Sequence, residues 1–127
     1  MPATAKKKSV QTRPQGLEGK WKIIEMPDLT EDYLSESKDP HIKITVYKRG
    51  DVSGRYQYGL CEGEIDGEVV AGTEGKPPGI RFSFEGLDEM EQVSGYGVAT
   101  LSDDNKTLTG KLHYHMGDDW RFTCRRT

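Results

Sequence analysis

Two histidines near the C-terminus are the side chains whose type and spacing most directly suggest chemistry. His113 and His115 are separated by one residue, and side chains two apart on a strand point the same way. Both imidazoles could therefore hold a metal ion, with Asp118 or Asp119 beside them. They share the strand face of Lys111, however, which the apolar pattern places on the outside. We interpret the pair as part of an exposed polar face, keep a metal site as the weaker alternative, and expect no cofactor.

The candidate nucleophiles have no neighbour in the sequence that would activate them. Cys124 lies beside Arg125 and Ser94 lies near an acidic stretch, but no histidine base is indicated for either. The lone G-x-G at residues 95–97 lies inside a strand pattern, so it predicts no phosphate site. Cys61 and Cys124 are too few for a disulfide scaffold and fit no zinc spacing. Enzymatic activity, for instance as a hydrolase, is therefore only the third function that we consider.

The composition limits what the chain can build around these residues. Its 127 residues suffice for one domain, and 33% of them are hydrophobic against 31% charged, which predicts a small core. Its glycines and prolines lie between short patterned runs, as in turn-rich all-β folds. The formal net charge of -3 gives no general attraction to nucleic acid or to anionic membranes. No apolar run resembles a membrane helix or a secretory signal, so we expect a cytoplasmic protein.

The chain divides into a tail and one domain. Residues 1–16 lack apolar periodicity and carry several basic side chains, which predicts a disordered basic tail. Residues 17–127 are expected to form a single β-barrel domain, because patterned segments follow one another there without a break in composition.

Eight segments of this domain alternate between apolar and polar residues, as half-buried strands do. They cover residues 17–25, 41–48, 55–60, 62–70, 80–85, 94–101, 107–116 and 118–126. Asp28 is a good N-cap with Glu31 at the capping-box position, so a short helix should follow the first strand. Asp66-Gly67 is itself a hairpin-turn pair, but a turn near residues 59–62 leaves both flanking strands a useful length. An acidic loop or single turn is expected at residues 86–93.

Short links between sequential strands favour antiparallel neighbours without long crossovers. We therefore predict an all-β fold, an eight-stranded antiparallel up-and-down meander barrel with a short helix after the first strand. Closure of the barrel would also remove the two exposed sheet edges.

The two ends of the meander carry a tryptophan and an arginine at matching positions. Gly19-Lys20-Trp21 lies near the start of the first strand, and Arg126 lies on the inner face at the end of the last. With the short helix after the first strand, these features resemble the calycins, the lipocalin, fatty-acid-binding and avidin type of barrel. The resemblance implies that Trp21 and Arg126 pack together where the barrel closes, and that a ligand pocket is possible. Such a cation–π contact contributes roughly 0.5–2 kcal/mol.

Successive links of an up-and-down barrel fall at alternate ends. One end should therefore collect the helix and the links near residues 61, 87–93 and 116–119. Its acidic side chains include Glu31, Asp32, Asp88, Glu89, Glu91, Asp118 and Asp119. We expect this acidic mouth to favour a cationic ligand or a basic protein partner, unless the acidic links only keep a small protein soluble.

Aromatic side chains dominate the predicted inner face. They are Trp21, Tyr56, Tyr58, Phe82, Phe84, Tyr96, Tyr114, Trp120 and Phe122. These rings should fill much of the barrel opposite glycines such as Gly97 and Gly110, which argues against a large lipid cavity. A shallow pocket near the mouth would be lined by Tyr58, Phe84, Tyr114 and Trp120.

The predicted function is a non-enzymatic binding barrel that takes a small, partly apolar or cationic ligand at the acidic mouth. The competing prediction is a protein-interaction module whose acidic end and basic tail contact a partner chain. An empty mouth pocket would favour the first, and a filled barrel with a flat acidic face would favour the second. The ligand, the partner and the oligomeric state stay open at this point.

Overall fold

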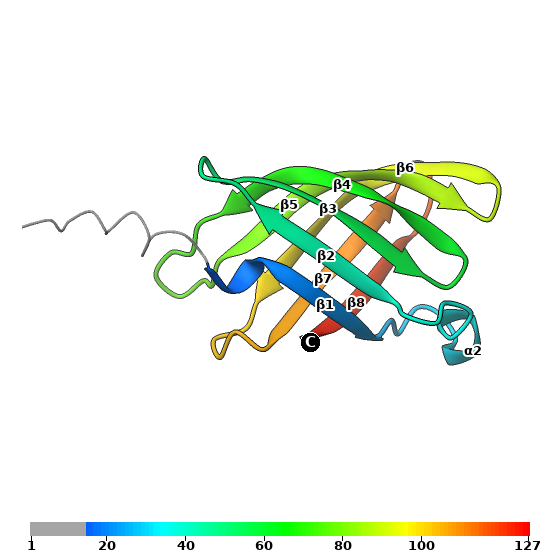
Figure 1. The fold of residues 1–127 in the computed structure, drawn as a ribbon, viewed down its shortest axis with the longest axis horizontal. Coiled ribbons are helices and arrows are strands. Elements are labelled where there is room, and N and C mark those ends of the chain that lie inside the picture. The colour runs from blue at the N-terminus through cyan, green and yellow to red at the C-terminus, as the bar shows by residue number, and fades with distance from the viewer. Residues whose placement is uncertain (1–14) are drawn as a thin grey trace, which may run out of the picture.

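The strands close into a single barrel. We describe residues 15–127 of a computed structural model of the chain. The strands are β1 (Gly19–Glu25), β2 (His41–Val46), β3 (Asp51–Tyr58), β4 (Cys61–Val70), β5 (Gly79–Asp88), β6 (Glu91–Leu101), β7 (Thr107–Tyr114) and β8 (Asp119–Arg126). Each strand pairs antiparallel with the next, and β1 also pairs with β8, which closes the sheet (Figure 1). The predicted eight-stranded up-and-down meander is confirmed.

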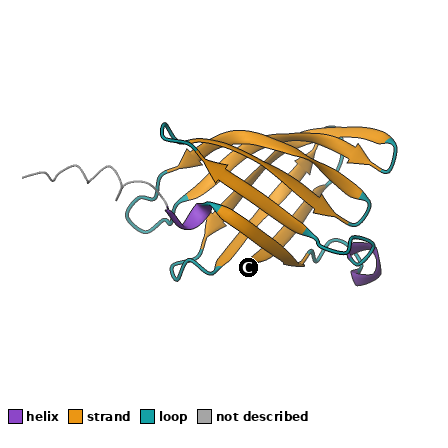
Figure 2. Cartoon of the chain, in the orientation of Figure 1, coloured by secondary structure: helices purple, strands orange, loops and turns teal. Residues whose placement is uncertain are grey.

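Two short helices accompany the strands. The 3-10 helix η1 (Gln15–Leu17) precedes β1, and α2 (Glu31–Leu34) follows it (Figure 2). The predicted tail lies outside the described residues over positions 1–14, while positions 15 and 16 belong to η1. Leu17 is fully buried, and its carbonyl accepts a hydrogen bond from Trp21 Nε1 at 3.1 Å. The start of the domain is therefore anchored to the core.

The barrel interior is filled with side chains. Ile42, Ile44 and Val46 of β2 are buried as their alternation predicts, and rings from the other strands complete the core. The remaining interior void has a volume of about 10 Å³, which is at the lower limit for one water molecule. A Cβ atom at Gly97 would lie 2.7 Å from Cζ of Phe82, so the missing side chain makes room for the ring. No long apolar ligand fits inside.

Several predicted boundaries differ from the structure. Residues 86–93 form no loop, because β5 and β6 continue their pairing to Asp88 and Glu91 and leave a turn of only Glu89 and Met90. Strand β3 already begins at Asp51, before the predicted segment 55–60. The preferred turn near residues 59–62 is confirmed, since Asp66-Gly67 lies in mid-strand opposite β3 and β5.

Asp28 is not the cap of the helix. Thr30 occupies the N-cap, where its side-chain oxygen accepts from the backbone N–H of Tyr33 at 3.1 Å. The Asp28 carboxylate instead accepts from Arg121 of β8, at 2.8 Å from the backbone N and at 3.1 and 3.0 Å from Nε and Nη2. A carboxylate that could cap a helix can also bind a distant side chain. Here the Asp28 carboxylate binds the Arg121 guanidinium instead of the helix N-terminus.

The links segregate to two ends of the barrel. α2 and the β3–β4, β5–β6 and β7–β8 turns lie at one end, which we call the mouth end (Figure 1). η1 and the other three links lie at the opposite end. Within residues 15–127, no helix has the length and apolar character needed to cross a membrane.

Candidate functional site

An open depression at the mouth end is lined by aromatic and acidic side chains. Its volume is about 450 Å³, within the range of small-molecule sites. We call it the mouth pocket, and its lining consists of Leu29, Tyr33, Tyr58, Leu60, Cys61, Asp88, Glu89, Val93, Tyr114, Gly117, Asp118 and Trp120. The lining residues come from the α2 region and from all three turns of the mouth end.

Larger depressions lie on the outer face of the sheet. Their volumes are about 1090 and 720 Å³, and outward-facing polar and charged side chains of β2 to β6 form most of their lining. Arg55 and Glu64 in this region already pair with each other at 3.0 Å. We place the candidate site at the mouth instead, because aromatic rings line it there and no comparable set of rings lines the outer depressions.

Three of the four residues predicted for the pocket line it. Tyr58 ends β3, Tyr114 ends β7 and Trp120 lies near the start of β8, so closure of the barrel brings the three rings to one rim. Phe84 does not line the pocket. It is 3% exposed and packs behind Tyr114, with ring centroids 5.0 Å apart.

Tyr33 and Cys61 belong to the pocket although the sequence pattern did not identify them. Tyr33 projects from α2, and its ring packs over Gly59, where any Cβ atom would clash with it. Gly59 has a φ of 53°, a conformation that glycine adopts without strain. The sequence shows that Tyr33 follows the apolar Leu29 by four residues, which places both on one face of a helix. The direction of the Tyr33 side chain, however, depends on how α2 packs against the barrel.

A chain of hydroxyl groups and one thiol forms the floor of the pocket. The Tyr58 and Tyr114 hydroxyls are hydrogen-bonded to each other, and Tyr114 also donates to Cys61 Sγ at 3.8 Å. Tyr33 Oη lies 3.4 Å from the same sulfur and accepts from the Leu60 backbone N–H at 3.3 Å. These contacts fix the rings, so the floor is preorganised before any ligand arrives.

Burial keeps these groups neutral. It raises the pKa of the Tyr33, Tyr58 and Tyr114 hydroxyls well above the usual tyrosine range. Burial also raises the pKa of the Cys61 thiol, although hydrogen bonds from Tyr33 and Tyr114 act in the opposite direction. A thiol is a weak nucleophile compared with a thiolate, so the pocket offers hydrogen bonds and ring faces rather than a nucleophile.

The predicted acidic residues take different positions. Asp88, Glu89 and Asp118 line the mouth pocket. Glu31 and Asp32 on α2 and Glu91 at the start of β6 are exposed at the same end without lining it.

Asp119 points to the outer face of the barrel. Its carboxylate contacts His113 Nδ1 and lies 3.4 Å from Lys111 Nζ. The hydrogen bond from His113 lowers the pKa of Asp119, and Lys111 adds to the effect. This carboxylate is therefore already paired and adds little to the field at the mouth.

The two histidines belong to different elements. His113 lies on the outer face of β7, whereas His115 follows the end of that strand and is exposed in the β7–β8 turn. Among the residues that the structure describes, no three histidine, cysteine or carboxylate side chains cluster as metal ligands.

Tyr96 points outward, contrary to the predicted inward position. Its side chain is 59% exposed and stacks on His113, with ring centroids 4.7 Å apart. Gly95 and Gly97 occupy the inward positions beside it, where the Phe84 and Phe82 rings fill their space. Because neighbouring strand residues face opposite sides, Tyr96 must face solvent.

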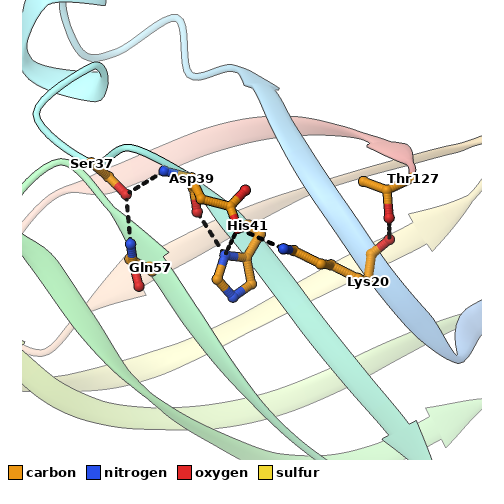
Figure 3. Close-up of polar contacts among 6 residues, drawn as sticks. All are labelled: Lys20, Ser37, Asp39, His41, Gln57 and Thr127. Carbon is orange, nitrogen blue, oxygen red and sulfur yellow. Dashed lines mark hydrogen bonds and ion pairs between the residues drawn. The ribbon is translucent and has the colours of Figure 1, made fainter.

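The connection between α2 and β2 is held against the barrel wall (Figure 3). Ser37 Oγ accepts from Gln57 Nε2 at 2.8 Å and from the Asp39 backbone N–H at 3.3 Å. Asp39 Oδ2 lies 2.5 Å from Lys20 Nζ, and His41 Nδ1 lies 2.6 Å from the Asp39 carbonyl oxygen. These contacts anchor the segment after α2 to β1 and β3, and so they help to position the α2 side of the pocket.

Comparison with protein-family models, with curated proteins and with solved structures finds no match for this chain.

Proposed function

We propose that the barrel binds a small, partly apolar cation in the mouth pocket. The observation that carries this proposal is the set of partly accessible rings of Tyr33, Tyr114 and Trp120 beside the Asp88 carboxylate. Each ring face attracts a cation by roughly 0.5–2 kcal/mol, depending on how far the cation is desolvated. A carboxylate at the rim strengthens that attraction, and apolar residues such as Leu29 accommodate the uncharged part of the ligand.

The lining also disfavours other classes of ligand. No lysine, arginine or histidine of residues 15–127 lines the mouth pocket, so a fatty-acid carboxylate would find no counter-charge there. The interior void of about 10 Å³ below it admits no acyl chain. The expected ligand is therefore short, positively charged, and held at the mouth.

We also propose that the barrel is calycin-like and acts in the cytoplasm. The Arg126 guanidinium lies 4.2 Å from the Trp21 ring centroid, which supports the first point. Cys61 and Cys124 are free and buried, which suits a reducing compartment and supports the second.

Choline and its neutral tert-butyl isostere provide a direct test, because the two differ in charge and hardly in shape. Titration followed by NMR should shift the Trp120 indole and Gly117 amide signals with choline, and the isostere should bind at least about tenfold more weakly. Asp88→Asn should weaken choline binding, whereas Asp103→Asn at the opposite end should leave it unchanged. Equal binding of both compounds, or shifts confined to the outer face, would contradict the proposal.

The competing prediction assigned the acidic end and the basic tail to a protein contact. For that function we expected a flat acidic face, whereas a depression of about 450 Å³ favours a ligand. The tail itself lies outside the described residues over positions 1–14.

A further inference from the structure

The three turns of the mouth end carry exposed apolar side chains. Met90 in the β5–β6 turn is 91% exposed, and Met116 in the β7–β8 turn is 92% exposed. Leu60 in the β3–β4 turn is 41% exposed. We call these three residues the rim. Leu60 lines the mouth pocket itself, and so do Glu89 and Gly117, the chain neighbours of the two methionines. The rim therefore borders the pocket on the side of the three turns.

Acidic side chains alternate with the rim. The three turns and the strand ends beside them, at residues 59–62, 87–92 and 115–119, contain no lysine or arginine. Glu62, Asp88, Glu91 and Asp118 lie within or beside them and are free of ion pairs within the described residues. Methionine adapts its shape to different apolar partners, and a surrounding negative field selects partners of positive charge. This combination matches a basic chain segment that also carries apolar residues.

A small free cation in the mouth pocket would not account for the exposed apolar side chains of the rim. It would be contained in the mouth pocket, whereas Met90 and Met116 project from it into solvent. A polypeptide that crosses the mouth would use both, because one side chain can enter the pocket while its neighbours contact the rim. Lysine suits the pocket, since it carries a compact ammonium on a flexible apolar stem.

We propose that the mouth receives a lysine side chain, free or methylated, presented by a basic and apolar segment of a partner protein. The ammonium lies against Tyr33, Tyr114 and Trp120, with Asp88 as its counter-charge. Apolar residues that flank the lysine pack on Met90 and Met116, and further basic residues face the acidic turns. This inference rests on the proposed cation binding and names the molecule that would carry the cation.

Peptides that differ only at their central residue test the inference on the full chain. The probe is acetyl-Leu-Arg-Lys-Arg-Leu-amide, compared with its norleucine and trimethyllysine counterparts, with affinities measured by calorimetry. The lysine or trimethyllysine peptide should bind at least tenfold more tightly than the norleucine peptide and than choline. The better of the two shows whether the lysine is methylated.

Rim variants separate the partner from the cation. Met90→Ser combined with Met116→Ser should weaken the peptide at least tenfold and leave choline affinity within twofold. Val98→Ser, which alters an exposed apolar residue on the outer face, should change neither. Circular dichroism should show the same thermal transition for all three proteins, because these side chains are exposed.

The outcomes distinguish the two proposals. Absence of choline binding to the unaltered protein would overturn the proposed function. Two outcomes would overturn only this inference. In both the protein binds choline, but either it binds the lysine and norleucine peptides equally well, or the rim variants leave its affinity for the peptide unchanged. Methionine-dependent binding to phosphatidylcholine vesicles without peptide binding would assign the rim to a lipid surface, and would also overturn it.

Discussion

Arg126 contacts both sides of the seam where β1 and β8 close the barrel. Its guanidinium lies 4.2 Å from the centroid of the buried Trp21 ring. It also donates to the carbonyl oxygens of Asn105 and Glu18, each at 3.1 Å, and to that of Gly16. One side chain thus joins β8 to the β6–β7 turn and to the segment before β1. A planar donor fork is required, because a point charge cannot stack and reach several carbonyls at once.

Replacing Arg126 with lysine keeps the charge and removes this geometry. We expect Arg126→Lys to lower the free energy of unfolding by about 1–3 kcal/mol, the sum of a weakened cation–π contact and lost hydrogen bonds. Urea denaturation measures the change. Arg125→Lys is the matched control, because the side chain of Arg125 is exposed. This substitution should change the free energy of unfolding by less than about 0.5 kcal/mol. Equal effects at both positions would show that the Arg126 contacts do not stabilise the closed barrel.

Among the elements, the turns of the mouth end hold unusual backbone conformations. Glu89 has a φ of 62° and Met116 a φ of 56°, in the left-handed region that side chains with a Cβ atom rarely adopt. Both residues belong to the turns that bear the rim and adjoin the pocket. Such strain persists where the surrounding structure over-determines it, and it often accompanies binding sites.

Asparagine at the strained position should relieve part of this cost. We expect Met116→Asn to raise the free energy of unfolding by about 0.5–1 kcal/mol, because asparagine tolerates the left-handed region better than methionine. Met90→Asn is the control, since Met90 is equally exposed but is not in the left-handed region. The denaturant midpoint should therefore rise for the first variant and stay level or fall for the second. A fall for both would contradict the assigned strain.

At the scale of the whole molecule, tyrosine hydroxyls are concentrated in and below the mouth. Tyr33, Tyr58 and Tyr114 form the pocket floor. Tyr56 packs against Tyr58, with ring centroids 6.0 Å apart, and its buried hydroxyl has no partner among the described residues. Burial raises the pKa of all four above the usual value of 10.0. It also raises the pKa of Cys124 to about 12. The fold therefore requires the neutral form of these groups.

This requirement predicts how stability depends on alkaline pH. Loss of stability begins near about pH 9, where the cysteine thiols ionise in the unfolded chain but stay protonated in the folded one. The tyrosines are protonated in both states up to about pH 10. Above it the unfolded chain releases protons that the folded chain keeps, so the free energy of unfolding should fall by up to ~1.4 kcal/mol per pH unit for each tyrosine.

Denaturant titrations at increasing pH measure this slope. Tyr56→Phe should make it shallower, because one buried phenol is removed while the ring remains. Tyr47→Phe should leave it unchanged, because that side chain is exposed. A slope that neither substitution alters would contradict the assignment to buried tyrosines.

Part of the candidate site was predictable and part was not. Tyr58, Tyr114 and Trp120 could be placed near the mouth because each lies at a strand end, and strand ends meet once the order of strands is known. That Tyr33 lines the pocket, and that Phe84 is buried behind Tyr114 instead of lining it, depend on packing across the barrel. Strand parity gives the side of the sheet to which a residue points but not its depth.

The sequence by itself determined the strands, their order and the filled interior. Alternation along a strand and short links between strands are local properties, and a local pattern is legible in the chain. Only the tertiary structure decided that Asp28 pairs with Arg121 and that Cys61 joins the tyrosine floor. These contacts join residues far apart in the chain or on neighbouring strands, and they depend on the curvature with which the sheet closes. No local pattern encodes that curvature.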